Sequence, residues 1–377
     1  MGEVMISDWT LWLEWFIKSL VLTLALLVGF ILLTWFERRA LARIQTRVGP
    51  NRAGPFGLLQ PIADALKLIF KEELTPAKAY KFVFFLAPII TVVPSIIIAA
   101  VIPFGRSINL FGREINLYLA DINVGVLYFM SIAAIAVYGI VLAGWSSNSK
   151  YAMLGGLRST AQMISYELSL GISLIPVILL ANSFRMIDIV ETQSTWWFVV
   201  LQPVGALIFW IATLAEVNRA PFDMPEAEQE LTAGYHAEYS GMKFALFFMA
   251  EYQKMIVISA VMAVFFFGGY LGPGVDQYPL LGPVYMAIKI VVLLFAMIWV
   301  RATWPRLRYD RLMSFGWKVL VPLSLAIVFI TATGILLAEQ TKNGLWMWAI
   351  PATSVIVGLI PVVTIFRALR RLSYGRA

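Results

Sequence analysis

Long apolar runs, separated by shorter polar connections, dominate the pattern of this chain. An α-helix rises about 1.5 Å per residue, so about 20 apolar residues cross the hydrocarbon core of a bilayer. Nine runs have roughly this length, at residues 11–36, 82–103, 124–145, 162–181, 198–215, 244–267, 284–303, 316–338 and 346–366. The pattern predicts an all-α, polytopic membrane protein of about nine transmembrane helices.

These runs indicate one integral membrane domain over residues 1–377, because no tandem repeat or low-complexity linker divides the chain. The first run is not typical of a cleaved signal peptide. It lacks a preceding basic region, it is too long, and no small-residue cleavage site follows it.

The connection at 37–81 combines a basic row, a turn and an amphipathic segment. Arg39, Arg43 and Arg47 recur every four residues, which places them on one helical face. The stretch "GPNRAGPFG" then predicts a turn. Residues 61–71 have apolar side chains on one side and Asp64, Lys67 and Lys71 on the other, which predicts an interfacial helix. The segment is either a lipid-headgroup anchor or the rim of an opening into the membrane interior.

The distribution of Lys and Arg predicts the topology. Alternate connections and the C-terminal tail hold 22 of these residues, whereas the remaining connections hold only Arg106, Arg113, Arg185 and Lys342. We therefore expect the N-terminus outside and the C-terminus in the cytoplasm.

The connection at 216–243 is acidic although it is predicted to face the cytoplasm. Apolar and turn residues interrupt its carboxylates, which indicates packing against protein rather than a solvated face. Carboxylates held close together raise each other's proton affinity. The segment is therefore a candidate proton reservoir, with Glu216, Asp223, Glu226, Glu228, Glu230 and Glu238.

Two further acids lie within predicted spans, where an unpaired carboxylate costs several kcal/mol. Glu167 is a candidate proton carrier, and the alternative is a structural residue hydrogen-bonded by Tyr166 or Gln162. Glu251 is a second candidate for the proton path. Its alternative is neutralisation by Lys254, three residues later.

The sequence indicates a functional role less strongly for the other charged residues and for the histidine. Lys18 pairs at i, i+4 with Glu14 as an interfacial anchor, and Lys289 remains an unassigned candidate. The single histidine, His236, is expected at a surface or an interface, with a proton role as the less favoured alternative.

Composition excludes several kinds of chemistry from this chain. Sixty per cent of the residues are apolar, 14% are charged, and mean hydropathy is +0.81, all typical of an integral membrane protein. The absence of cysteine excludes disulfides and thiolate-held iron–sulfur clusters, and one histidine excludes bis-histidine haem ligation.

Four stretches carry a family resemblance, and they occur in order on the predicted cytoplasmic connections. They begin "ERRALARIQTRVGPNRAGPFG", "AVYGIVLAGWSSNSKYAMLGG", "LAEVNRAPFDMPEAEQELTAGYHAEYSG" and "WVRATWPRLRYDRLMSFGWK". Over roughly residues 10–340 the chain resembles the H subunit of NADH-quinone oxidoreductase, the membrane subunit 1 family of respiratory complex I. The ninth run resembles the additional C-terminal helix of some bacterial members.

The resemblance implies a proton-pumping NADH:quinone oxidoreductase in the bacterial inner membrane. Such a membrane component contains no redox centre, because FMN and the iron–sulfur clusters belong to partner subunits. Quinone, either ubiquinone or menaquinone, is the substrate. The implied partners are other membrane-arm subunits, the peripheral quinone-site subunits including the one with the terminal cluster, and lipid, without nucleic acid.

The resemblance also implies roles for residues. The quinone chamber and its entrance correspond to Arg39, Arg43, Arg47, Phe56, Asp64 and Lys67. The quinone-coupling loop contains Glu216, Arg219, Asp223, Glu226, Glu228, Glu230 and Glu238. The proton path corresponds to Glu167, Glu216 and Glu251. Some relatives have an acid in the third span where this chain has Ala134, which places more of the path on Glu167.

Three other functions are consistent with parts of the pattern. The first is the membrane anchor of an energy-converting hydrogenase or a related quinone- or phenazine-linked complex. The second is an ion-coupled transporter with Glu167 as its ion site, although no inverted repeat is visible. The third is a structural scaffold, against which the intramembrane acids argue.

Overall fold

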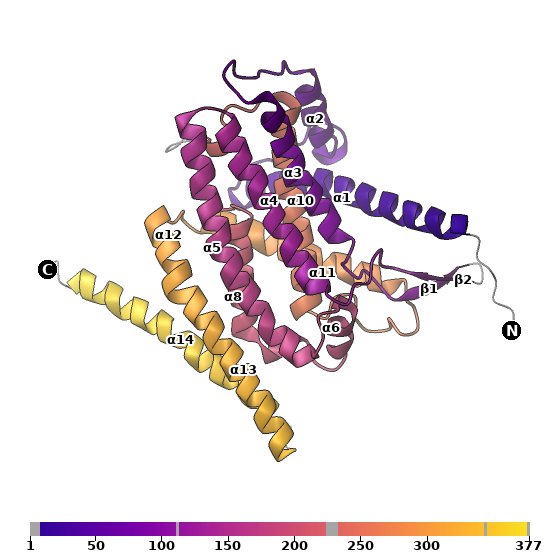
Figure 1. Cartoon of the computed structure of the whole chain (residues 1–377), viewed down its shortest axis with the longest axis vertical. Coiled ribbons are helices and arrows are strands. Elements are labelled where there is room, and N and C mark those ends of the chain that lie inside the picture. Colours follow the sequence, from indigo (N-terminus) through magenta and orange to yellow (C-terminus); the bar gives the residue numbers. More distant parts are fainter. Residues whose placement is uncertain (1–7, 111–112, 224–232, 343–344, 375–377) are drawn as a thin grey trace.

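The computed structural model describes residues 8–110, 113–223, 233–342 and 345–374. Helices dominate this part of the chain (Figure 1). In chain order they are α1 (Asp8–Ile44), α2 (Gln60–Phe70), α3 (Lys81–Ala99), α4 (Gly125–Ser146), α5 (Lys150–Ala181), α6 (Met186–Thr192), α7 (Phe198–Leu201), α8 (Pro203–Glu216), α10 (Gly241–Phe266), α11 (Leu281–Thr303), α12 (Tyr309–Phe315), α13 (Val321–Thr341) and α14 (Leu345–Tyr374).

Short elements complete the described fold. Two 3₁₀ turns, η1 (Pro55–Gly57) and η2 (Gly234–His236), lie in connections, and a π-helical stretch, η3 (Gly316–Leu320), joins α12 to α13. Strands β1 (Ser107–Leu110) and β2 (Arg113–Asn116) form an antiparallel hairpin in which Ser107 pairs with Asn116 and Leu110 with Arg113.

Seven described helical segments are long and apolar enough to cross a membrane, and they correspond to seven of the nine predicted spans. The shorter apolar helices Pro203–Glu216 and Leu345–Pro361 coincide with the other two. The prediction of an all-α polytopic membrane protein is therefore confirmed. The small hairpin β1–β2 was not predicted.

Several helices differ in length from the apolar runs that predicted them. Helix α5 begins at Lys150 and α1 continues to Ile44, because polar residues extend each helix beyond its apolar run. The predicted span 198–215 is broken at Gln202, between α7 and α8. At about 1.5 Å per residue, the 14 residues of α8 are too short to span the hydrocarbon core alone.

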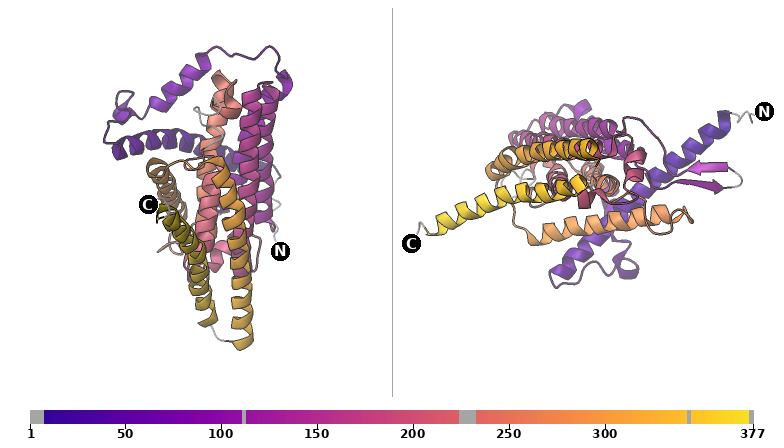
Figure 2. Two further views of the ribbon diagram at one scale, coloured as in Figure 1. Left: turned by 90° about the vertical axis from the view of Figure 1, so that its left-hand side faces the viewer. Right: turned by 90° about the horizontal axis from the view of Figure 1, so that it is seen from below.

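The helices form a bundle that α1 crosses (Figures 1 and 2). Within the bundle α3 packs against α4 and α10, and α5 packs against α4, α8 and α13. Figure 2 shows α1 running crosswise to the long helices of the bundle and the C-terminal end of α14 diverging from them. Helix α1 contacts α10 and α11.

Buried aromatic residues and close backbone contacts hold the centre of the bundle. Phe209 on α8 lies against Phe265 and Phe266 on α10, with ring centroids 6.4 and 5.5 Å away. A Cβ at Gly155 on α5 would lie 2.5 Å from the Cα of Gly234 in η2. Only glycine permits this approach, which brings the end of the 216–243 connection against α5.

Candidate functional site

The connection that follows α8 turns back into the bundle and is held there by α5. Gln162 Nε2 donates hydrogen bonds to the carbonyl oxygens of Ala215 and Phe222, both at 2.9 Å, and to Asn218 Oδ1 at 3.2 Å. Asn218, in the left-handed region with φ 54°, donates from Nδ2 to Ser159 Oγ at 2.9 Å. These contacts fix the backbone on both sides of Arg219.

Arg219 is the centre of a buried charge network that joins α1, α10 and α11. Its Nε lies 2.6 Å from Glu251 Oε1, and its Nη1 donates to Glu37 Oε1 at 3.3 Å. Glu37 also pairs with Arg301, and the Arg219 guanidinium lies 4.4 Å from the centroid of the Tyr252 ring. Buried charges are tolerated when they are paired in this way. The Arg219 and Glu37 side chains are only 6% and 3% exposed.

Glu37 was missed by the sequence reasoning, although it is the first residue of the quoted "ERRALAR" stretch. The feature that could have identified Glu37 was its position as an acid at the end of an apolar run, directly before the basic row. Arg301, at the end of α11, was likewise counted only as a topology residue.

Electrostatics in the 216–243 connection follow from burial and from these partners. Burial disfavours the charged form of Arg219, but the carboxylates of Glu251 and Glu37 outweigh it and raise the Arg219 pKa. Burial raises the pKa of Asp223 above its usual value, against the effect of Arg306, whose Nη2 lies 3.2 Å from Asp223 Oδ2. Burial lowers the pKa of His236 to about 4, so this imidazole is neutral at pH 7.

A second ion pair lies beside this network. Lys254 Nζ lies 2.9 Å from Glu216 Oε1 and donates to the Glu216 carbonyl oxygen at 3.3 Å. The interpretation that Lys254 neutralises Glu251 is wrong, because Lys254 pairs with α8 and Glu251 pairs with Arg219. Helical spacing alone does not choose between an i, i+3 partner and a closer one on another element.

Glu167 is half-buried on α5 and lies within electrostatic range of Glu216 and Lys254. The two donors considered for it bond elsewhere. Tyr166 donates from its hydroxyl to the Leu312 carbonyl oxygen at 2.9 Å, and Gln162 holds the connection after α8. Within the described residues, the Glu167 carboxylate forms no hydrogen bond or ion pair.

Two small cavities lie among the charged residues of the Arg219 network and the Glu216–Lys254 pair. The first, the Lys254 cavity, has a volume of about 40 Å³ and is lined by Glu216, Lys254 and Glu251 among others. The second, the Arg219 cavity, has about 130 Å³ and is lined by Arg219, Asp223, His236, Glu251 and Arg301 among others. Glu251 lines both cavities, so it stands between the Arg219 network and the Glu216–Lys254 pair.

The predicted entrance residues divide into two groups. Arg39 Nη1 donates to the Phe56 carbonyl oxygen at 2.6 Å, and its guanidinium lies 5.3 Å from the centroid of the Phe56 ring. Trp35 Nε1 donates to the same oxygen at 3.0 Å. Asp64 on α2 pairs with Arg38 at 2.5 Å. These contacts fix the turn and α2 against the end of α1.

Arg43, Arg47 and Lys67 are exposed. The prediction that three arginines share one helical face is wrong for Arg47, because α1 ends at Ile44. Thr46 adopts the left-handed conformation with φ 55°, and the Arg47 amide donates to the Ala42 carbonyl oxygen at 2.8 Å. This is a Schellman ending without glycine. Helix α2 exposes Ile62, Leu66, Ile69 and Phe70.

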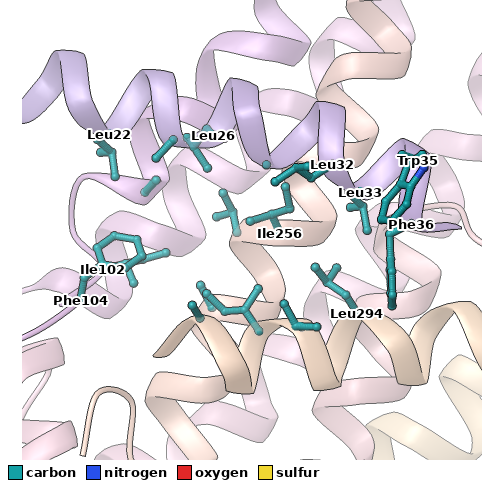
Figure 3. Close-up of a pocket in the computed structure, with 18 residues that line it drawn as sticks. Leu22, Leu26, Leu32, Leu33, Trp35, Phe36, Ile102, Phe104, Ile256 and Leu294 are labelled. Atoms are coloured by element: carbon teal, nitrogen blue, oxygen red, sulfur yellow. The ribbon is translucent and has the colours of Figure 1, made fainter. Parts of the chain in front are cut away.

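An apolar cavity of about 450 Å³ lies beneath α1 (Figure 3). Leu22, Leu26 and Leu33 on α1 face Ile256 on α10 and Leu294 on α11 across it. Its lining also includes Trp35, which donates a hydrogen bond to the Phe56 carbonyl oxygen in the turn before α2. The cavity has the volume and the apolar lining to hold a hydrocarbon chain.

The remaining predicted residues lie in different settings. Glu238 is half-buried, and Glu226, Glu228 and Glu230 lie outside the described residues. Lys289 donates to the carbonyl oxygens of Gly269 and Leu271 at 2.7 and 2.8 Å, so it holds the turn after α10. Lys18 forms the predicted pair with Glu14, at 2.6 Å.

Comparison with known proteins shows the family of the chain. The family model described as NADH dehydrogenase matches residues 17–332. An NADH-quinone oxidoreductase H subunit of Syntrophobacter fumaroxidans is 51% identical over 331 residues, which are 87% of this chain and 98% of that protein. An H subunit of the same enzyme from Geobacter sulfurreducens is 54% identical over 82% of this chain and 92% of its own length.

The corresponding H subunit of Rickettsia bellii is 49% identical over 87% of this chain and 95% of its own length. Helix α14 begins at Leu345, beyond the residues that the family model matches. The chain therefore belongs to the NADH dehydrogenase family, as a member of the group of NADH-quinone oxidoreductase H subunits, the membrane subunits of NADH:quinone oxidoreductase.

Proposed function

We propose that this chain forms the membrane part of a quinone chamber and couples quinone reduction to proton translocation. The observation that carries the proposal is the buried network of Glu37, Arg219, Glu251 and Arg301, which adjoins the Glu216–Lys254 pair through two cavities. Buried ionisable groups that line a cavity within a membrane are functional candidates by default.

Quinone binding divides between apolar and charged parts of the site. The apolar cavity beneath α1 suits the hydrocarbon tail, and Trp35 and Phe56 connect it to the proposed entrance with Arg39, Arg43, Arg47, Asp64 and Lys67. Reduction of the headgroup by two electrons consumes two protons and passes through anionic charge. Arg219 and Arg301 line the Arg219 cavity, and their positive charges would attract that anion.

Coupling follows from the pairing of the charges. An anion near Arg219 competes with Glu251 and Glu37 for its guanidinium, because all three are negative. A carboxylate that loses its cation binds a proton more readily. Protonation then reaches the Lys254 cavity through Glu251 and continues to Glu216 and Glu167. The acids of the 216–243 connection, Glu226, Glu228, Glu230 and Glu238 among them, would supply protons.

The proposal includes the assembly. A single membrane domain with its N-terminus outside lies in the bacterial inner membrane, beside other membrane-arm subunits and lipid. Peripheral subunits contribute FMN and the iron–sulfur clusters, including the terminal cluster next to the chamber. Helix α2 and the α4–α5 connection lie toward the same end of the bundle (Figure 1), which supports a common cytoplasmic side for these basic connections.

The test is purification of the tagged chain from native membranes, with identification of the proteins that accompany it. The purified complex should oxidise NADH with a short-chain quinone as acceptor, and a photoactivatable quinone should label peptides around Trp35, Phe56 or Arg219. Purification without flavin- and cluster-bearing partners would overturn the proposal. Labelling confined to other subunits would remove the chamber from this chain.

A further inference from the structure

The first turn of α10 contains a buried lysine, Lys243, that the coupling described above does not use. Its side chain is only 6% exposed. The ammonium lies 3.3 Å from Glu73 Oε2, donates to Thr75 Oγ1 at 3.1 Å and lies 3.9 Å from the centroid of the Phe85 ring. Glu73 and Thr75 lie between α2 and α3, and Phe85 is on α3. One side chain of α10 therefore contacts the segment that follows α2 and the helix after it.

The preferences of α10 itself do not explain a lysine at this position. A cation near the first turn of a helix is disfavoured by the positive end of the helix dipole. Burial of an ammonium also costs free energy unless a partner compensates it. The Glu73 carboxylate and the face of the Phe85 ring supply that compensation. Contacts with other elements therefore account for Lys243.

The backbone supports the same attachment. Ser240 Oγ donates to the Glu72 carbonyl oxygen at 3.3 Å. Gly241 has φ 59°, and a Cβ at this position would lie 3.3 Å from Glu73 Cγ and 3.6 Å from the Leu68 carbonyl oxygen. Glycine adopts this conformation without strain and leaves room for the neighbouring chain. The end of the 216–243 connection thus lies directly against the C-terminal part of α2 and the residues after it.

Helix α2 is consequently held at two places. Asp64 within it pairs with Arg38 on α1, and Glu73, three residues beyond its end at Phe70, pairs with Lys243 on α10. Helix α2 contacts both α1 and α10. These two helices also line the apolar cavity of Figure 3. The second ion pair therefore determines how α2 lies relative to one wall of that cavity.

We propose that Lys243 is a positioning residue that holds α2 against α10 and keeps the proposed entrance at the width that a quinone tail requires. This inference rests on the proposed function. Without the ammonium, the C-terminal end of α2 is free to move away from α10, and a hydrocarbon tail loses contacts along that side. A short-chain quinone has little tail to lose such contacts. Lys243 should therefore affect the binding of long-tail quinones more than their reduction.

The first measurement compares Lys243→Met, Lys243→Arg and the wild type in the whole complex, with one long-tail and one short-chain quinone. We expect Lys243→Met to raise the KM for the long-tail quinone about fivefold with little change in kcat, because only binding is weakened. The KM for the short-chain quinone should change less. Lys243→Arg keeps the charge and can stack on the Phe85 ring, so it should restore the wild-type values. Lys78→Met removes an exposed lysine of the same connection and is the matched control.

The second measurement follows α2 without any quinone. The chain has no cysteine, so Leu68→Cys introduces a single thiol, at a half-buried position of α2 beside Gly241. Its labelling by a water-soluble maleimide should be faster when Lys243→Met is also present, and unchanged when Lys78→Met is present. If the quinone label is confined to other subunits while this difference persists, the proposed function fails and the attachment of α2 by Lys243 stands.

Unchanged thiol labelling in an assembled Lys243→Met complex overturns the inference. Equal rises in KM for both quinones together with a lower kcat also overturn it, because they indicate a general structural brace. If Lys243→Met does not assemble, Glu73→Gln decides. It removes the acid on the more exposed side of the pair, at 46% exposure, and leaves the contacts of Lys243 with Thr75 and Phe85. A smaller shift in the same direction supports the inference, and wild-type labelling and KM in Glu73→Gln overturn it.

Discussion

Arg219 Nε lies 2.6 Å from Glu251 Oε1, so a residue from the connection after α8 takes the partner that helical spacing would assign to Lys254. This exchange of partners links three elements that are far apart in the sequence. Glu251 becomes part of a network with α1 and α11, and Lys254 is released to pair with Glu216 on α8.

The first prediction concerns the stability of this network. Glu251→Gln leaves Arg219 with Glu37 alone and gives the network a net positive charge. Breaking a buried ion pair on one side typically costs about 3–5 kcal/mol, so we expect less assembled complex and earlier thermal inactivation. Asp310→Asn is the matched control, because its pair with Arg308 is 75–78% exposed and contributes little. Equal stability of the two variants would contradict the arrangement of charges described here.

The sequence was sufficient for the elements that depend on local pattern. Apolar runs located the helices, and the amphipathic pattern of residues 61–71 located α2, because burial in lipid or at its surface follows directly from side-chain type. The apolar pattern does not show whether Glu167, Glu216 and Glu251 belong to one site. Their common proton path was inferred only from the resemblance to a family.

Partners within the site could not be predicted, because they depend on how helices cross. Glu37 lies beside Arg219 only because α1 crosses the bundle, and no periodicity in one helix contains that information. The end of α1 was also missed. Thr46 adopts a left-handed conformation that usually indicates glycine or asparagine, so no residue type at this point signalled that Arg47 leaves the helical face.

The second prediction separates the two groups of entrance arginines. Arg39→Ala removes the hydrogen bond to the Phe56 carbonyl and the contact with its ring. The turn then keeps only the Trp35 hydrogen bond to the Phe56 carbonyl oxygen, so we expect less assembled complex together with weaker quinone reduction. Arg43→Ala and Arg47→Ala remove exposed side chains, so these complexes should assemble normally while the KM for quinone rises. NADH oxidation by an artificial acceptor should persist in all three variants, because the proposed function places its site in another subunit.

Complex abundance and the KM for quinone are measured together for this comparison. Wild-type quinone kinetics in fully assembled Arg43→Ala and Arg47→Ala complexes would remove both residues from the entrance. Wild-type abundance and kinetics in Arg39→Ala would show that its contacts with Phe56 do not hold the turn.

The third prediction concerns acid stability of the 216–243 connection. The pKa of His236 is lowered to about 4 by burial, whereas an exposed histidine titrates near 6.5. The neutral imidazole is therefore favoured in the folded protein. Its contribution to stability is fully present above pH 6.5 and is lost as pH falls from 6.5 toward 4. At pH 5 the free energy of unfolding is lower by about 2 kcal/mol.

His236→Phe removes this titration and fits surroundings that include the Tyr235 and Phe244 rings, with centroids 4.8 and 5.5 Å away. We expect the variant to keep more activity than the wild type after incubation at pH 5 and the same activity after incubation at pH 7.5. Residual quinone reductase activity after neutralisation is the measurement. An equal loss at pH 5 in both proteins would show that His236 does not report on the opening of this connection.

The fourth prediction concerns the proton path itself. Glu167→Gln preserves the size and hydrogen-bonding capacity of the side chain and removes its titrating proton. If Glu167 only holds helices together, the substitution should be nearly silent, because a neutral amide fills the same space at a lower desolvation cost. A purely structural role has little support, since neither Tyr166 nor Gln162 donates to this carboxylate. We therefore expect an assembled complex with an active flavin site and a loss of proton translocation of at least tenfold.

Glu216→Gln tests whether both acids serve one path. It removes the carboxylate that Lys254 contacts at 2.9 Å, and the freed ammonium then neutralises Glu167, so translocation should again be lost. Once either acid is gone the path is interrupted, so the double variant should be no worse than the more severe single one, a less than additive result. Proton translocation and quinone-dependent NADH oxidation are measured in reconstituted vesicles, with complex abundance as the control. Additive losses would place the acids on separate routes, and wild-type translocation in Glu167→Gln would leave that residue as part of the helix packing alone.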